Sequence, residues 1–382
     1  MSFFSGRITC TRFRVSGRAV RQFGEEQVEA LARHAIGKRR VATADGSAVG
    51  WIGGDHILDT RFDLAKNIVN DCLQFALRID TQKIPSDLLR AYTQEELDAL
   101  HDDASRPPGV KVKREARARA RQRLETEAAD GRYLRRVAVP MLWDSQSGEL
   151  LAGTTGISAL DRVLPMFRET FERGLEMLTA GTQAFQQAEA REQSRHVDDA
   201  KPTGFIAGRD GSVVWVPDDA NRDFLGNEFL LWLWHRLENE ADEVTLIDNS
   251  KVTVMMSRSL ALECPLGQTG KQSLLSEGPG RLPEAHRALQ AGKLPRKAGL
   301  TLVRHDQQYE LTLHAESLAI GGAKLPVPEA LEERARHEER VTQIRHLLET
   351  LDLLYGAFLE ARLGDGWGKE LKKIRQWLKE AE

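Results

Sequence analysis

Alternating apolar and polar positions predict the strands of this chain. The opening segment GRITCTRFRVS alternates and is rich in β-branched and aromatic residues, which indicates a strand. SAVGWIGG and DCLQFALRIDTQKI have the same character, and RRVAVPMLWDSQSGELLAGTT predicts a hairpin with its turn at Asp144–Gly148. Further on, VTLIDNSKVTVMMSRSLALECPL predicts one or two strands, and AGLTLVRHDQQYELTLHAESLAIGGAKLP predicts a meander with a tight turn near His305–Gln307.

Helical periodicity predicts a second set of elements between these strands. Apolar residues recur at helical spacing in EEQVEALARHAI, PSDLLRAYTQEELDALHDDA, ISALDRVLPMFRETFERGLEML, FLGNEFLLWLWHRLENE and PEAHRALQAGK. A long amphipathic helix is expected from Pro328 to Leu363, and a short basic helix over Gly366–Glu382. Gly267–Pro283 has the composition of a loop. Strands and helices occur in groups rather than in strict βαβ alternation, which predicts an α+β fold with mixed sheets.

The order of these segments predicts a multi-domain chain. Its 382 residues are enough for two or three domains. We expect an N-terminal α+β region made of residues 1–80 and 133–180, with residues 81–132 forming a helical projection from it. Residues 181–212 are polar and rich in Gln, Ala and Glu, which predicts a linker, and residues 213–382 are expected to form a C-terminal α+β region that ends in long helices.

Charge is distributed unevenly along the chain. The net charge is −3, yet Arg106–Arg123 holds eight cationic residues and one acid, Glu115, which makes +7 for this stretch and −3 − 7 = −10 for the rest. The stretch is rich in Ala and Arg, predicts a helix, and is too polar all round to be a core helix. Acids that would pair with these cations at i,i+4 are scarce. Two interpretations stay open at this point: a solvated surface helix, or a helix that binds a polyanion.

A search for catalytic motifs finds no enzyme signature. Gly267–Ser273 resembles a phosphate-binding loop but lacks its spacing, and Gly53-Gly54 lacks the third glycine of a dinucleotide site. His196, Asp198 and Asp199 fit a solvated loop better than a metal site. We therefore expect no enzymatic activity, no cofactor and no metal. Trp232, Trp234 and His235 lie on a helix that is apolar on every side, which favours core or interface packing over base stacking.

The cellular compartment is predicted from cysteines and hydropathy. The three cysteines, Cys10, Cys72 and Cys264, form no CxxC pair, and so few thiols fit a reducing compartment. The first residues carry arginines where a signal peptide needs an apolar stretch, and no run of 18 apolar residues occurs. We expect a cytoplasmic protein without a membrane span.

Several short motifs occur together in an order that resembles a known family. These are Phe3-Phe4, Trp51 in SAVGWIGG, KIPS at residues 83–86, the basic helix, VPMLWD at residues 139–144 and a helix with Ser158, Asp161, Phe167 and Phe171. RALQAGKLPRKAGLTL at residues 287–302, a strand pair and a long C-terminal helix follow. The order is similar to that of the recombination-associated RdgC family, and the likeness extends over nearly the whole chain.

The resemblance implies a structure and a function. It implies an RdgC-like, horseshoe-like monomer with long helices, two copies of which close into a ring-like dimer. Such a homodimer encircles double-stranded DNA through a basic inner surface, without sequence preference, and restrains a RecA-type recombinase through the DNA that both need. A nucleoid-associated protein of the cytoplasm is therefore expected, one that binds no membrane and has no enzymatic activity.

The basic segments supply the residues expected to contact DNA. Lys113, Arg114, Arg117 and Arg121 share about a 100° arc of the predicted helix and form the primary set. The other expected contacts are Lys111, Arg119 and Arg123 on the same helix and Arg12 and Arg14 on one face of the first strand. Two alternatives stay open: a non-enzymatic interaction scaffold whose basic helix docks an acidic protein, and a metal-dependent nuclease with dispersed carboxylates.

Overall fold

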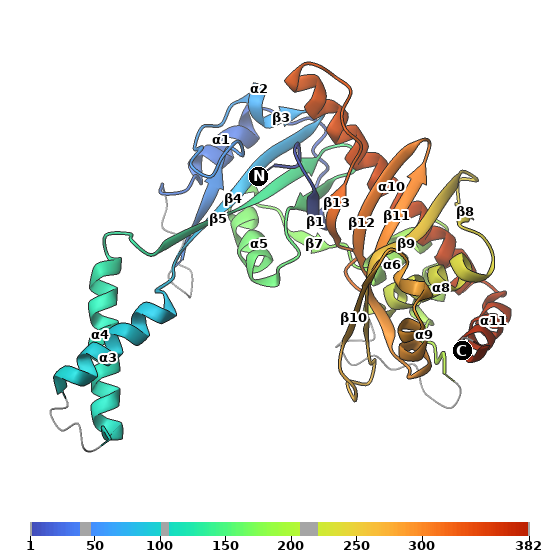
Figure 1. Cartoon of the computed structure of the whole chain (residues 1–382). Helices are drawn as coiled ribbons and strands as arrows, with labels where there is room; N and C mark the ends of the chain where they lie inside the picture. Colours follow the sequence, from blue (N-terminus) through green and yellow to red (C-terminus); the bar gives the residue numbers. More distant parts are fainter. Residues whose placement is uncertain (1, 39–46, 101–106, 207–220, 381–382) are drawn as a thin grey trace.

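One large antiparallel sheet with helices packed on it organises the molecule (Figure 1). The structure is a computed structural model that describes residues 2–38, 47–100, 107–206 and 221–380. The strand order is β10-β9-β11-β12-β13-β1-β6-β5-β4-β2, with β3, β7 and β8 paired at its margins. This confirms the α+β class. The expectation of mixed sheets was wrong, because every strand pair in the described residues is antiparallel.

The first half of the sheet is built from the N-terminal part of the chain. Its strands are β1 (Ile8–Val15), β2 (Ala48–Ile52), β3 (Ile68–Val69), β4 (Cys72–Gln82), β5 (Leu134–Asp144), β6 (Glu149–Ala152) and β7 (Leu175–Met177). Helices α1 (Glu25–Arg33) and α5 (Ile157–Phe171) cover one face, and α2 (Leu64–Asn67) lies at its margin. The core of this layer is aromatic: Trp51, Phe75 and Trp143 are fully buried in it, and the Trp51 Nε1 donates to Thr170 Oγ1 at 2.7 Å.

The second half of the sheet is built from the C-terminal part of the chain. Its strands are β8 (Glu243–Thr245), β9 (Lys251–Glu263), β10 (Gln272–Ser276), β11 (Leu294–Arg304), β12 (Gln307–His314) and β13 (Ile320–Lys324). The helices that pack with it are α6 (Ala180–Glu189), α7 (Ser194–Asp198), α8 (Phe224–Asn239), α9 (Pro283–Gln290), α10 (Glu333–Leu363) and α11 (Trp367–Glu380), with a 3₁₀ turn at Pro279–Arg281. As predicted, Trp232 and Trp234 of α8 are core residues, each about 1% exposed.

Strand β1 joins the two halves into one sheet. Its first residues pair with β13, Ile8 opposite Ala323 and Cys10 opposite Ile320, while Thr11–Arg14 pair with β6. Helix α10 reinforces this junction. Arg345 of α10 binds Asp144 of β5 with both contacts at 2.8 Å, so the longest helix is tied to the first half of the sheet as well as to the second.

Two segments expected to be irregular are regular. Most of residues 181–198 of the predicted linker lie in α6 and α7, because Ala180, Ala184 and Ala188 recur every fourth residue and are buried in the core together with Val197. Residues 199–206 form no helix or strand, as predicted, and residues 207–212 lie outside the described residues. The predicted loop Gly267–Pro283 contains β10, an edge strand that pairs with β9.

A two-helix arm projects from the first half of the sheet (Figure 1). It consists of α3 (Ser86–Leu100) and α4 (Val110–Ala128), and β4 and β5 carry it, since α3 follows the end of β4 and α4 precedes β5. We call α3 and α4 the arm. Most of the basic segment singled out from the sequence lies on it.

Candidate nucleic-acid interface

The packing of the arm explains which side chains of α4 reach solvent. Ala116, Ala120, Leu124 and Ala128 are buried at every fourth position. These small residues let α4 approach α3 closely, and α3 contributes half-buried side chains such as Leu89 to the contact. Since this stripe supplies the fully buried side chains of α4, most of the remaining positions can carry charge.

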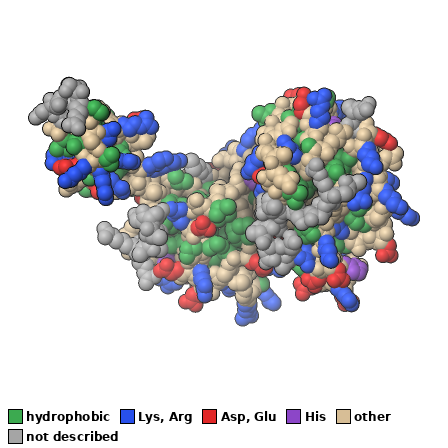
Figure 2. All heavy atoms as spheres, turned by 90° about the horizontal axis from the view of Figure 1, so that it is seen from below, with side chains coloured by type: hydrophobic (Ala, Val, Ile, Leu, Met, Phe, Trp, Pro, Cys, Tyr) green, Lys and Arg blue, Asp and Glu red, His purple; other side chains and the backbone are tan. Residues whose placement is uncertain are grey.

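All seven cations of α4 are exposed (Figure 2). They are Lys111, Lys113, Arg114, Arg117, Arg119, Arg121 and Arg123. In the view from below, Lys and Arg side chains gather over the arm at the left of the molecule. Helix α4 therefore presents a positively charged surface away from the body of the protein.

Three of the seven cations have acidic partners. Arg119 pairs with Glu115 at 2.8 Å, Arg121 pairs with Glu125 at 2.9 Å, both at i,i+4, and Arg123 pairs with Glu95 of α3 at 2.9 Å. The expectation that such partners are missing was wrong for these positions. Exposed pairs of this kind contribute about 0–1 kcal/mol, so a phosphate can replace the carboxylate at Arg119 or Arg121 at little cost.

Arg123 has a structural role in the arm. Its guanidinium lies 3.9 Å from the centre of the Tyr92 ring, and the hydrogen bond to Glu95 raises its pKa. Glu127 accepts from both Tyr92 and Tyr133 at 3.0 to 3.3 Å, which closes a polar network between α3, α4 and the start of β5. Arg123 therefore belongs to the packing of the arm more than to its outer surface.

The other four cations form the candidate anion-binding surface. Lys111, Lys113, Arg114 and Arg117 make no ion pair with any residue that the structure describes, and all four are exposed. We call these four residues the α4 cation set. Because no carboxylate neutralises them, they are the cations on the arm that gain most from a polyanion.

The two arginines of the first strand do not fit the role predicted for them. Arg12 is 4% exposed, and its guanidinium binds Glu149 of β6 at 2.9 and 3.0 Å and Asp352 of α10 at 2.6 and 2.7 Å. These bonds use four of the five N–H donors of the guanidinium, and because the side chain is buried a phosphate cannot reach the fifth. Arg14 is half-buried and lies opposite Glu149 and Glu176 on the neighbouring strands, so acids face it from both sides.

Basic residues at the base of the arm were missed in the sequence. Lys83 and Arg135 are exposed where β4 and β5 leave the sheet, next to Arg136, which pairs with Asp80 at 3.8 Å. The signal is present in Arg135-Arg136, the first two residues of the segment that predicts the hairpin. Lys83 and Arg135 extend the positive surface from the arm toward the body.

The remaining candidates from the sequence take ordinary structural places. Lys271 of the glycine-rich loop pairs with Glu263 at 3.4 Å, and Asp199 lies 3.7 Å from Arg195. In the part of the chain that the structure describes, no group of three or more metal-ligating side chains converges. His235 is 3% exposed and packs against Trp377, which confirms its prediction as a core histidine.

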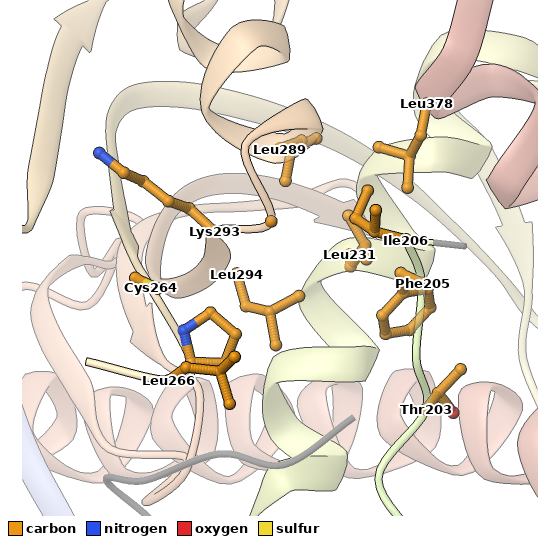
Figure 3. A pocket seen from close by; sticks show the side chains of 12 residues that line it. Thr203, Phe205, Ile206, Leu231, Cys264, Leu266, Leu289, Lys293, Leu294 and Leu378 are labelled. Carbon is orange, nitrogen blue, oxygen red and sulfur yellow. The ribbon is translucent and has the colours of Figure 1, made fainter. Parts of the chain in front are cut away.

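A small apolar pocket lies near the end of β9 (Figure 3). Leu231, Leu289 and Leu294 line it, with Cys264 at one end and Leu378 at the other. Its volume of about 30 Å³ is room for one or two water molecules, so it does not hold an organic ligand as it stands.

The chain matches no model of a known protein family, and no curated protein matches it significantly. Among the described residues, no helix combines the length and the apolar character that crossing a membrane requires.

Proposed function

We propose that this chain is a sequence-independent double-stranded DNA-binding protein of the RdgC-like kind, without enzymatic activity. The observation that carries the proposal is the α4 cation set: four exposed cations without an ion-pair partner, on a helix that projects from an otherwise acidic chain. Phosphates are the natural partners of such a helix, because each contact releases condensed counterions. Contacts of this kind read the backbone and carry no sequence information.

The proposed assembly is a ring-like homodimer. The monomer curves between the arm and its C-terminal helices, a shape that suits a horseshoe whose open side a second copy closes (Figure 1). Helix α3 supports this, because none of its side chains is fully buried and its leucines, Leu88, Leu89, Leu97 and Leu100, all stay partly exposed. A two-helix arm that leaves this much apolar surface open is suited to pack against another arm.

The proposed cellular role follows from occupancy of DNA. A nucleoid-associated protein that encloses duplex DNA withholds it from a RecA-type recombinase and so restrains homologous recombination. The order of sequence motifs supports this role, and the arm provides the surface for it.

A salt series with two matched variants tests the proposal. Anisotropy of a labelled duplex of about 30 bp is measured from about 50 to 200 mM salt for the wild type and for a variant in which the α4 cation set becomes Gln. Four lost phosphate contacts lower the log–log salt slope by about 3.6, since each contributes about 0.9, and they weaken binding accordingly. The control replaces four exposed lysines of α11, Lys369, Lys372, Lys373 and Lys379, by Gln.

The outcomes separate the hypotheses. The proposal is supported if only the α4 variant loses affinity for the duplex and has a lower salt slope. Equal losses in the α4 variant and the α11 control contradict it, because the net charge of the protein would then explain the binding. If the wild type does not bind the duplex at low salt, the interaction scaffold with an acidic protein partner replaces it. Cleavage of the duplex in the presence of Mg²⁺ or Mn²⁺ would favour the nuclease. Light scattering on the same samples should give the mass of two chains of 42.8 kDa.

A further inference from the structure

A second candidate site lies far from the arm, in a cleft between the two halves of the sheet. The cleft has a volume of about 630 Å³, within the usual range of small-molecule sites. Residues of β1, α5 and β7 form one wall, and residues of β9 to β12 form the other. No residue of the arm lines it, so this site is independent of the proposed DNA surface.

The wall formed by β9 to β12 is cationic. Arg296 lies between two carboxylates, Glu263 at 2.7 Å and Glu316 at 2.6 Å, and is neutralised by them. Lys271 shares Glu263 at 3.4 Å, whereas Lys297 is exposed and makes no ion pair with a described residue. The wall therefore keeps one more cation than carboxylates.

His314 completes this wall. It lies directly opposite Lys297 on the neighbouring strand. Its burial and the neighbouring Lys297 and Arg296 lower its pKa to about 4, so its ring is neutral near pH 7. A neutral imidazole donates one hydrogen bond, and an anion bound between His314 and Lys297 would offset the two cations and raise the pKa of the ring.

The opposite wall is apolar and ends at a helix N-terminus. Leu160, Met177 and the exposed side chain of Ile157, 75% accessible, line it. Thr155 and Ile157 lie at the start of α5, where Gly156 caps the helix without a side-chain hydrogen bond and the first turn holds no acid. The helix dipole therefore adds positive potential at the mouth of the cleft.

We propose that this cleft binds a nucleoside phosphate. The phosphates lie against Lys297, Lys271 and His314, and the flat base packs on Ile157, Leu160 and Met177. A sugar between them places its hydroxyl groups within reach of Glu316, since a carboxylate is the usual acceptor for a ribose hydroxyl. One cationic wall, one apolar wall and a carboxylate in a single cleft fit this class of ligand better than a simple anion.

Calorimetry on the full-length protein tests the site with ATP and with inorganic phosphate as probes. The wild type should bind ATP, and Lys297→Gln should weaken ATP binding about 10- to 100-fold, the effect of losing one hydrogen bond to a charged group. Ile157→Ser should weaken ATP but not phosphate, and its high exposure leaves the fold intact. Lys324→Gln, an exposed lysine on the same sheet but outside the cleft, should leave binding within about twofold.

Four results would overturn the assignment. The first is no heat of binding with ATP at millimolar concentration, and the second is an equal loss of ATP affinity in Lys297→Gln and Lys324→Gln. The third is phosphate binding as tightly as ATP. The fourth is a DNA duplex that displaces ATP and whose own affinity Lys297→Gln lowers. The last result would make the cleft a contact for DNA phosphates. Unchanged ATP binding by the α4 variant supports two separate sites and distinguishes failure here from failure of the DNA proposal.

Discussion

The three cysteines have very different chemical surroundings. Burial raises the pKa of Cys10 to about 12 and raises that of Cys72 further. At Cys264 burial acts in the same direction, but hydrogen bonds from the Thr269 hydroxyl and from the amides of Thr269, Leu266 and Gln268 outweigh it and lower its pKa to about 7. Backbone amides that converge on a sulfur stabilise the thiolate in the same way as they stabilise other anions.

Selective alkylation of Cys264 is therefore expected. Cys264 is buried like the other two cysteines, but its lowered pKa makes the thiolate available at a lower pH, so iodoacetamide should modify it before Cys10 or Cys72, with a rate that levels off above about pH 8. Peptide mapping by mass spectrometry gives the site and the rate, and Cys264→Ser provides the control. A rate that keeps rising beyond pH 9, or modification of all three cysteines together, would show that the amides do not hold a thiolate.

The role of a residue can be predicted from the sequence where it depends on the residues next to it along the chain. The tryptophans of α8 were assigned to the core because apolar residues surround them in the sequence. Arg12 was assigned to DNA because nothing near it in the sequence reveals Glu149 and Asp352, which lie 137 and 340 residues away. The partners of a charge depend on tertiary structure, and single charged residues were therefore the least predictable part of the candidate site.

At the scale of elements, the arm depends on very little packing. The buried stripe of α4 contains three alanines and one leucine, Leu124. Leu124 is fully buried, so truncating it to alanine should cost about 2–5 kcal/mol. A cost of this size is a large fraction of the stability of two helices that pack mainly on each other.

Leu124→Ala should therefore melt the arm while the body stays folded. Hydrogen exchange followed by mass spectrometry should show faster exchange over α3 and α4 and unchanged exchange in β4, β5 and α10, together with weaker duplex binding. Val110→Ala, at a position 86% exposed, is the matched control and should change nothing. Cooperative loss of protection in the whole protein would contradict the independence of the arm.

Most elements were predictable, and the exceptions have physical reasons. The basic helix, the hairpin of β5 and β6 and the meander of β11 to β13 follow from periodicity and turn residues. Helices α6 and α7 were missed because glutamines and alanines make the segment polar on average, although its alanines recur at i,i+4. Strand β10 was missed because it is a short edge strand whose Leu275 is 82% exposed, so it lacks a buried face.

At the scale of the whole molecule, ion pairs hold α10 against the first half of the sheet. Arg12 ties β1 to β6 and α10, and Arg345 ties α10 to β5. Removing one partner of a buried pair leaves the remaining charge buried without compensation. The free energy lost in this way is larger than the net stabilisation that the intact pair provides. The ion pairs of Arg12 with Glu149 and Asp352 are therefore needed for the stability of the fold where β1 joins the two halves of the sheet.

Arg12→Met should lower the free energy of unfolding by about 3–5 kcal/mol, because Glu149 and Asp352 lose their shared cation. Urea unfolding followed by tryptophan fluorescence measures the change. Arg14→Met removes a half-buried cation from the same face of β1 and should cost less than about 1 kcal/mol. Equal effects of the two substitutions would show that the junction does not depend on the buried pair.

The fold class was predictable, but the arrangement of its parts was not. Grouped strands and helices are enough to indicate α+β. The pairing of β1 with β13 joins residues 323 − 8 = 315 positions apart, Ile8 and Ala323, and no local pattern specifies such a pair. Sequence therefore predicts the elements of both halves but not the strand that unites them.

The position of β1 has a consequence for synthesis on the ribosome. Ile8 of β1 is translated 315 residues before its partner Ala323 of β13, so at about 5–20 residues per second roughly 15–60 s pass before the pair can form. During that time the edge of β1 that pairs with β13 at Ile8 and Cys10 has no partner, and unpaired edges invite association between nascent chains. The yield of soluble protein should therefore depend on chaperones that bind the nascent chain until β13 has emerged.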